Sequence, residues 1–235
     1  GGPPELQRIF SSDTPVVSDL FQGPVTGKPI VALAVSDVPG DAPDLIAQGY
    51  LTRPVIGETG AEHYDTSALA VNSRGQFDAA AVDRAYHGHG RETAAIVADV
   101  VARSRDRRGV MLFAATVRHA EEVMASLPPD LSAMITGTTP KRERDSIIAR
   151  FKARRIKYLV SGGVLTTGFD APHVDVIAIL RKTESVGLLQ QIIGRGLRLH
   201  DGKTDCLVLD YTDNIETHCP DGDLFAPEVK AGKGG

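Results

Sequence analysis

The chain has 235 residues, a mass of 25.0 kDa and 42% hydrophobic residues, enough for one large domain or for one domain with an extension. Its formal net charge is -4, so any nucleic-acid binding must depend on a local basic surface. Two cysteines, Cys206 and Cys219, predict a reducing compartment and no disulfide framework. The sequence has no run of 18 apolar residues and no charged-then-apolar leader, which predicts a cytoplasmic protein without a membrane partner.

Residues 1–60 are rich in proline and glycine and show weak periodicity, which predicts an irregular N-terminal extension. The tract at 23–29 superficially resembles a phosphate-binding loop. It does not qualify, because its glycines are one residue too close together and Pro29 stands where a Ser or Thr would hold magnesium. Within the extension we expect a strand at 31–35, a short helix at 43–48, and an extended segment at 50–54 that leads into the main domain.

Residues 78–103 have a helical pattern that is interrupted by a His-Gly-His-Gly tract at 87–90. The histidines His87 and His89 suggest a metal site at first sight. No cysteine or carboxylate at ligand spacing completes such a site, so a glycine-containing bend between two helices is the favoured interpretation, and we expect no bound metal.

From residue 109 onward, apolar segments alternate regularly with helical ones. Continuous apolar strands that alternate with helices predict a parallel sheet with helices on both faces. We therefore expect an α/β domain over 61–213 and a flexible polar tail over 214–235. The expected strands are 110–114, 131–135, 156–160, 174–180 and 205–210, and the expected helices are 116–127, 140–152 and 184–198.

The last of these helices carries a polar row. Gln191, Gly194, Arg195 and Arg198 are spaced i, i+3, i+4 and i+7 and share one helical face. Two arginines beside a glutamine suit a phosphate, because guanidinium is always charged and binds oxyanions bidentately. A solvated basic face is the alternative. The opposite face is expected to be buried and contains Leu188, Leu189, Ile192, Ile193 and Leu199.

Glycines within this helix are unfavourable for helix formation by roughly 1 kcal/mol each, so Gly194 and Gly196 need another explanation. Glycine beside a charged row lets a ligand approach the backbone closely.

Two further stretches point to anion binding. Residues 161–170 follow the third strand at its carboxyl end, where parallel sheets bind ligands. There, small residues admit phosphates, Thr166 and Thr167 offer hydroxyls, and Asp170 can accept from a ribose; a tight loop with Asp170 as a cap is the alternative. The second stretch, 136–144, begins a helix with cations that oppose the macrodipole, which favours an external anion over a merely exposed basic helix end.

Four motifs in this order resemble those of the superfamily two helicases and nucleic-acid-dependent ATPases. They correspond to motif IV at 113–116, the following motif at 136–144, motif V at 161–170, and motif VI, Q-x-x-G-R-x-x-R, at 191–198. The resemblance covers about residues 109–212 and is greatest to the RadD-like branch of bacterial and phage DNA-repair ATPases. Two departures are visible: Gly162 and Gly163 replace the Thr-Asp pair common in the DEAD-box branch, and no cysteine-rich region follows.

This resemblance implies the fold of the second RecA-like domain, with ATP in the cleft between two such domains. The phosphate-binding lysine and the magnesium ligands are then expected from a first RecA-like domain. Residue by residue, it implies catalytic roles for Arg195, Arg198 and Gln191, ATP contacts for Gly168, Asp170 and Gly194, and nucleic-acid contacts for Thr116, Gly137, Arg144, Thr166 and Thr167.

The implied function is the C-terminal half of an ATP-dependent DNA helicase or translocase of the DNA-repair type. Its expected partners are single-stranded or branched DNA and the first RecA-like domain, and its expected location is the nucleoid. Without Walker motifs of its own, the isolated chain is expected to be inactive. Two alternatives stay open: a non-catalytic nucleic-acid- or protein-binding module, and the motor domain of a restriction or remodelling enzyme.

Overall fold

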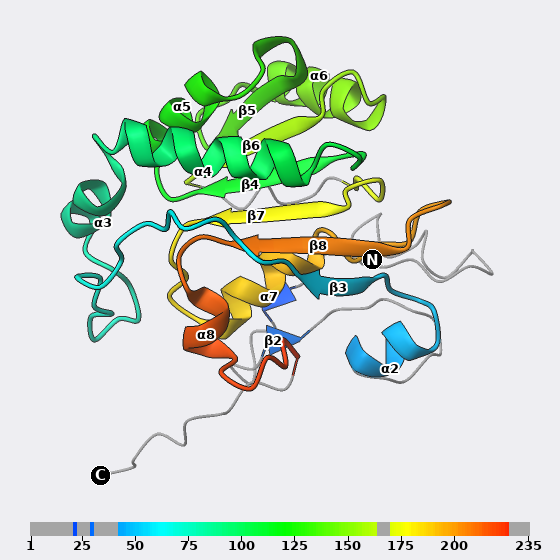
Figure 1. The fold of residues 1–235 in the computed structure, drawn as a ribbon, viewed down its shortest axis with the longest axis horizontal. Coiled ribbons are helices and arrows are strands. Elements are labelled where there is room, and N and C mark those ends of the chain that lie inside the picture. Colours follow the sequence, from blue (N-terminus) through cyan, green and yellow to red (C-terminus); the bar gives the residue numbers. More distant parts are fainter. Residues whose placement is uncertain (1–20, 23–28, 31–41, 164–169, 226–235) are drawn as a thin grey trace, which may run out of the picture.

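A six-stranded parallel sheet forms the centre of the molecule, which is seen here in a computed structural model that describes residues 21–22, 29–30, 42–163 and 170–225 (Figure 1). The strands lie in the order β3-β8-β7-β4-β6-β5. The predicted parallel α/β fold is therefore confirmed. The strands are β3 (Arg53–Ile56), β4 (Val110–Ala114), β5 (Ser132–Thr136), β6 (Tyr158–Gly162), β7 (Val176–Leu180) and β8 (Asp205–Asp210); β1 (Phe21–Gln22) and β2 (Pro29–Ile30) form a separate antiparallel pair.

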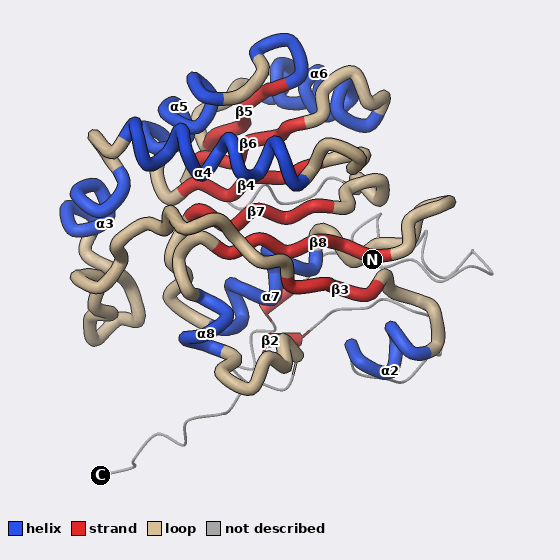
Figure 2. The backbone as a smooth tube through the Cα atoms, in the orientation of Figure 1, coloured by secondary structure: helices blue, strands red, loops and turns tan. Residues whose placement is uncertain are grey.

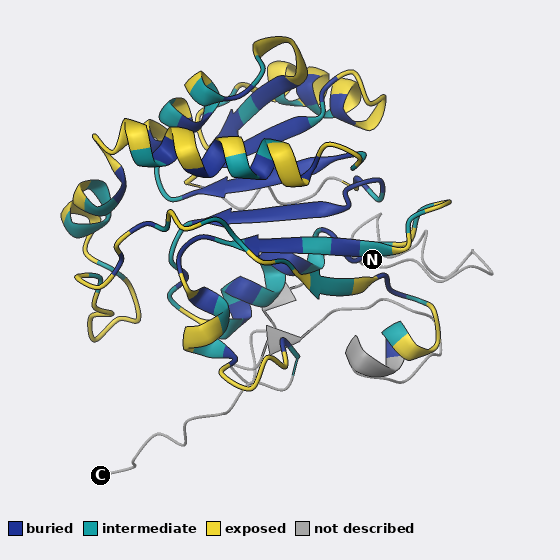
Figure 3. Cartoon of the chain, in the orientation of Figure 1, coloured by how far each residue is buried: buried dark blue, intermediate teal, exposed yellow. Residues whose placement is uncertain are grey.

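Helices cover both faces of the sheet, and this is why its central strands are apolar throughout (Figure 2). Every residue of β4, β6 and β7 is buried, as the dark blue strands show (Figure 3). Neighbouring residues of a strand point to opposite faces, so Phe113 packs with one helix layer and Leu112 with the other. One layer contains α4 (Gly90–Arg103) and α5 (Val117–Ser126), and the other contains α6 (Lys141–Lys152) and α7 (Val186–Gly194).

A capping residue begins α5 where the sequence predicts it. The Thr116 hydroxyl accepts from the His119 N–H at 3.1 Å and starts α5. Before α4, the predicted bend separates it from α3 (Ala79–Tyr86). In that bend His87 pairs with Glu122 at 3.0 Å. Nowhere in the described part of the chain do three His, Cys, Asp or Glu side chains gather as they would around a metal ion.

The helix predicted for 184–198 ends at Gly194, four residues early. Gly196 lies buried on the sheet, where an added Cβ would be 2.2 Å from Cys206 Sγ, so this glycine permits close packing rather than ligand approach. The chain leaves the helical path because the carbonyl oxygens of residues 196–198 accept from Thr52 and Lys203. Leu199 is consequently 51% exposed instead of buried, and Arg198 does not continue the face of α7.

Two segments outside the expected domain belong to the folded unit. The strand β3, predicted only as an extended segment, pairs in parallel with β8 at the sheet edge. The tail predicted to be flexible forms α8 (Asn214–His218), because the Asp210 carboxylate accepts from the Ile215 N–H at 2.8 Å and Asn214 is fully buried. Near the start, α2 (Ala42–Ala47) matches the predicted short helix, whereas the strand predicted at 31–35 lies outside the described residues. No described helix is both long and apolar enough to cross a membrane.

A buried histidine joins α5 to the segment before α3. His119 Nδ1 accepts from the Ala115 N–H at 3.2 Å, and its Nε2 lies 2.8 Å from the Tyr64 hydroxyl. Because Tyr64 donates to Thr93 at 3.1 Å, the hydrogen-bond network assigns the proton of the neutral ring to Nε2. Burial lowers the pKa of His119 to about 3, so the ring stays neutral in the folded protein.

Gly196→Ala is expected to lower the free energy of unfolding by about 1–3 kcal/mol, because the new methyl group collides with Cys206 and Ile177. Urea unfolding of the purified chain measures the change. Gly90→Ala is the matched control, since an added Cβ at this helix-start position meets nothing within 4 Å. Equal stabilities of the Gly196→Ala variant and the wild type would show that the contact is not tight in solution.

The neutral state of His119 predicts a pH-dependent stability. The folded pKa is lowered from 6.5 to about 3, so between these values the unfolded chain binds a proton that the folded chain does not. The contribution of His119 to the free energy of unfolding is complete above pH 6.5. It is lost as the pH falls toward the folded pKa, by at most about 1.4 kcal/mol per pH unit. His119→Gln keeps a donor and an acceptor but does not titrate, so its unfolding free energy should fall less steeply in acid. Urea midpoints measured across this range decide the matter; parallel curves for the two proteins would contradict it.

Candidate functional site

The predicted site residues separate onto the two opposite edges of the parallel sheet. Thr116 follows β4 and Gly137 follows β5, so both lie at the carboxyl edge. Arg198 lies at the amino edge, because its carbonyl oxygen accepts from the Thr52 hydroxyl at 3.0 Å, directly before β3. Asp170 lies with Arg198, which corrects its predicted place at the carboxyl end of the third strand.

An ion pair links the two motifs at the amino edge. Arg198 Nη1 lies 2.6 Å from Asp170 Oδ1. The arginine side chain is 12% exposed and the aspartate side chain 65%, so a covered guanidinium meets a carboxylate on the solvent side. Charged hydrogen bonds of this kind fix geometry as well as adding energy. The pair therefore fixes the position of a guanidinium, a group with the chemistry needed to bind an oxyanion.

Three other residues of the same predicted site precede Arg198 by three to seven positions. Gln191 is half-buried on α7, Gly194 is the last residue of that helix, and Arg195 caps it with helical dihedral angles of -61° and -29°. The structure thus brings Arg198 and Asp170 into contact and holds the other three nearby in the chain. Gly168, Thr166 and Thr167 lie outside the described residues.

At the carboxyl edge, Thr116 caps α5 and exposes the first turn of that helix. The N–H groups of a helical first turn carry partial positive charge and favour an anion. His119 Nδ1 accepts a hydrogen bond from the N–H group of Ala115, the residue before Thr116, and so fixes the backbone at the start of the helix. Sequence reasoning did not assign His119 a role, and its spacing of three residues from the capping threonine was the available signal.

Arg144 turns back onto its own loop. Its Nη2 donates to the carbonyl oxygens of Thr136 at 3.2 Å and Thr139 at 3.5 Å, and its Nε is buried without a hydrogen-bond partner. The exposed cations at the start of α6 are instead Lys141 and Arg142. Arg144 therefore shapes the loop that contains Gly137, and its two exposed neighbours are the cations that face solvent.

A pocket of about 230 Å³ opens beside Thr116, where β4 and β7 end. Phe77 and Tyr86 contribute aromatic rings to its lining, which also includes Arg181 and Lys182. The Arg181 Nε is buried without a hydrogen-bond partner, although its Nη2 lies 3.4 Å from Glu184. Sequence reasoning missed this pocket, because its lining comes from segments that only the fold brings together.

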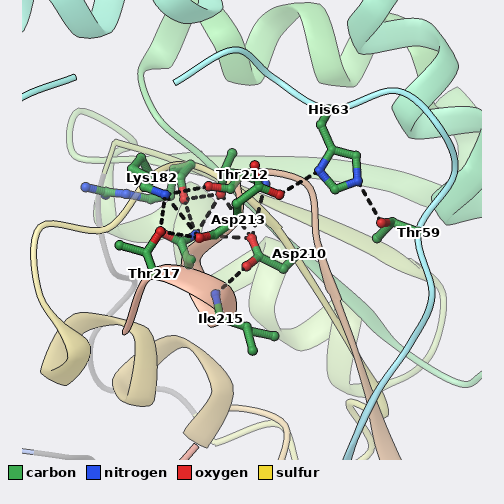
Figure 4. Close-up of polar contacts among 10 residues, drawn as sticks. Thr59, His63, Lys182, Asp210, Thr212, Asp213, Ile215 and Thr217 are labelled. Carbon is green, nitrogen blue, oxygen red and sulfur yellow. Dashed lines mark hydrogen bonds and ion pairs between the residues drawn. The ribbon is translucent and has the colours of Figure 1, made fainter. Parts of the chain in front are cut away.

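A polar network behind this pocket ties the loop after β7 to the C-terminal segment. Lys182 Nζ donates to the carbonyl oxygens of Thr212 at 3.0 Å and Asp213 at 3.1 Å (Figure 4). Thr212 and Asn214 in turn donate to the Arg181 carbonyl oxygen, at 3.0 and 2.9 Å. The segment predicted to be a flexible tail therefore helps to position Arg181 at the pocket.

Comparison with known proteins supports the motifs. Residues 92–200 match the helicase conserved C-terminal domain family. The irc3 protein of Schizosaccharomyces pombe, named as a mitochondrial ATP-dependent helicase, is 41% identical over 113 residues, covering 47% of this chain and 18% of that protein. The endonuclease subunit of the type I restriction enzyme EcoKI from Escherichia coli K12 is 32% identical over 123 residues, covering 46% of this chain and 10% of that subunit.

The fold also has a counterpart among solved structures. A fragment assigned as the HsdR subunit of a type I restriction enzyme from Vibrio vulnificus aligns with a TM-score of 0.57 at 24% identity, covering 78% of this chain and 36% of that one. The likeness to it concerns the fold alone, and the chain spans only a small part of the relatives that it matches in sequence. Within these bounds, residues 92–200 constitute a helicase conserved C-terminal domain, the second RecA-like domain of superfamily two.

Proposed function

We propose that this chain is the second RecA-like half of an ATP-dependent DNA helicase or translocase of the DNA-repair type. The observation that carries the proposal is the Arg198–Asp170 pair, which joins motif V to motif VI at the amino edge. ATP binds there, between this domain and a first RecA-like domain. DNA binds at the carboxyl edge, so the two ligands occupy separate surfaces of one sheet.

The donors at the amino edge fit a polyphosphate. A guanidinium group offers a planar fork of N–H donors to phosphate oxygens, and Arg195 and Arg198 each carry one. Bound ATP supplies the phosphoryl group that is transferred to water. Arginines that stabilise the charge on a transferred phosphoryl accelerate such reactions by about 10³–10⁵. Gln191 orients the attacking water or senses the terminal phosphate, and Gly168 and Gly194 admit the nucleotide close to the backbone.

The magnesium ligands and the phosphate-binding lysine come from the first RecA-like domain in this proposal. At the amino edge the Arg198 guanidinium suits phosphate oxygens, and the Asp170 carboxylate beside it is already engaged in the ion pair. The chain therefore contributes half of a composite site, and turnover requires both halves.

Phosphate contacts with DNA involve the carboxyl edge. The first turn of α5 at Thr116, the loop at Gly137, and the exposed Lys141 and Arg142 offer backbone N–H groups and cations along this edge. We include Arg144 as the residue that holds the Gly137 loop in place. Thr166 and Thr167, which lie outside the described residues, are proposed as further nucleic-acid contacts of motif V.

A second candidate is the motor domain of a restriction enzyme, favoured by the identity to the EcoKI subunit. The gene surrounding this chain distinguishes the two, because a nuclease domain beside the motor would establish the restriction type. A non-catalytic binding module is the third candidate, and it is excluded if the chain restores ATP turnover to a first RecA-like domain.

Arg198→Lys in the intact protein should lower DNA-stimulated ATP turnover by about 10²-fold or more, because lysine keeps the charge but loses the planar fork. Binding of ATP in the ground state should weaken far less than turnover, since the arginine acts in the transition state. Arg91→Lys on the exposed side of α4 is the matched control. The isolated chain should release no phosphate. Near-normal turnover of Arg198→Lys, at an unchanged melting temperature, would remove Arg198 from catalysis.

Binding of single-stranded DNA by the chain should be weak and should fall steeply between about 50 and 200 mM salt. Replacing Lys141 and Arg142 by alanine should reduce the salt slope by roughly one for each phosphate that the variant no longer neutralises. Lys152→Ala, at the other end of α6, provides the control. Fluorescence anisotropy titrations measure the affinities, and tight binding that ignores salt would contradict the assignment of this edge.

A further inference from the structure

Lys203 lies at the amino edge, between Arg198 and the start of β8. Its Nζ donates to three carbonyl oxygens: that of Gly196 at 2.6 Å, that of Arg198 at 2.7 Å and that of Pro172 at 3.3 Å. An ammonium group has three N–H donors, so these contacts use its full capacity. Only part of the side chain reaches solvent. Lys203 is thus directed at the backbone.

The three acceptors belong to the two segments that form the ion pair. Gly196 and Arg198 are in the irregular segment after α7, and Pro172 follows Asp170 by two residues. One ammonium therefore joins the backbones whose side chains meet at 2.6 Å. The Arg198 carbonyl oxygen also accepts from the Thr52 hydroxyl at 3.0 Å. Thr52 and Lys203 both donate to the carbonyl oxygen of Arg198, so the backbone that carries the guanidinium is fixed in position.

Partial burial of the Lys203 ammonium disfavours its charged form, because water solvates a charged group better than the protein interior does. The pKa of Lys203 is lowered to about 8: burial is the largest cause and Arg198 also lowers the pKa, whereas Cys206, Asp175 and Asp205 raise it. His173, in the loop before β7, also faces this group. Burial lowers the pKa of His173 to about 4 and raises that of Cys206 to about 12, so neither of them titrates near pH 8.

From this geometry we infer that Lys203 is a positioning residue for Arg198: its ammonium holds the backbone of motif VI against that of motif V, so that the guanidinium is presented in one orientation. The catalytic consequence rests on the proposed function of Arg198. Loss of the proton leaves an amine with two donors and no charge, which weakens all three contacts. Lys203 therefore makes the presentation of Arg198 dependent on pH.

The first test measures the position of Arg198 in this chain without requiring activity. Lys203→Met keeps most of the side-chain length and removes both charge and donors. The Nε–H proton of Arg198, followed through its ¹⁵N-resolved NMR signal, should exchange with solvent about tenfold faster in this variant, because local opening of the segment becomes easier. Lys157→Met is the matched control, since Lys157 Nζ donates to a carbonyl oxygen elsewhere, that of Arg105 at 2.9 Å. An unchanged Arg198 signal in folded Lys203→Met would overturn the inference.

If melting curves show that Lys203→Met does not fold, the wild-type chain supplies the same measurement. Raising the pH from about 7 to about 10 removes the Lys203 proton, so the Arg198 signal should change with a midpoint near 8. In Lys203→Arg the charge persists across this range, and the transition should vanish. A wild-type signal that does not change through this midpoint, or the same transition in Lys203→Arg, would overturn the inference.

The second test uses ATP turnover by the intact protein. Lys203→Met should lower kcat by about tenfold while changing KM for ATP little, because a misdirected arginine is missed mainly in the transition state. Wild-type turnover should fall through pH 8, and Lys203→Arg should remove this fall. An inactive wild type would count against the proposed function alone, since the Arg198 signal still reports on Lys203. If the wild type is active and Lys203→Met has the same kcat, the positioning role is overturned.

Discussion

The parallel pairing of β4 with both β6 and β7 is the constraint on which the rest of this structure depends. Ala114 lies in register with Gly162 on one side and with Leu180 on the other, so three chain segments leave the sheet at the same level. Thr116 and Arg181 follow two of these ends. At the opposite edge, the Asp175 carboxylate accepts from the Arg108 and Gly109 N–H groups and holds the entry of β7 to that of β4. The strand pairing and the Asp175 hydrogen bonds therefore fix the distance between the loops at the carboxyl edge and those at the amino edge.

Separation of the two edges has a mechanical consequence. In the sequence, the segment that begins after β6 leaves the carboxyl edge and reaches Asp170 and Pro172 at the amino edge before β7 begins. A single stretch of chain therefore connects the surface proposed for DNA with the surface proposed for ATP. A change in the contacts of Arg198 acts directly on one end of this stretch.

Close packing at Gly196 sets the geometry of the amino edge. Because a Cβ would collide with Cys206, the chain can approach β8 only without a side chain at this position. The approach ends α7 early and turns the carbonyl oxygens of residues 196–198 toward Thr52 and Lys203. In an uninterrupted helix, Arg198 would lie on the same face as Gln191 and Arg195. Because of Gly196, Arg198 lies outside the helix and contacts two separate segments, those of Thr52 and Asp170.

The sequence by itself determined the parallel α/β architecture and the start of α5 at Thr116, because apolar runs and capping residues are local properties of the chain. Only the tertiary structure decided where α7 ends, that β3 and α8 belong to the fold, and that Arg144 turns onto its own loop. The end of α7 and the inclusion of β3 and α8 depend on contacts between different segments, such as Gly196 with Cys206 and Asn214 with Thr183. Arg144 instead contacts carbonyl oxygens of its own loop, which a helical pattern does not reveal. Periodicity reports which face of a segment is apolar, but it contains no information on which distant group will take a given carbonyl oxygen. For that reason the roles of Lys203 and His119 became visible only when the sheet had placed their partners beside them.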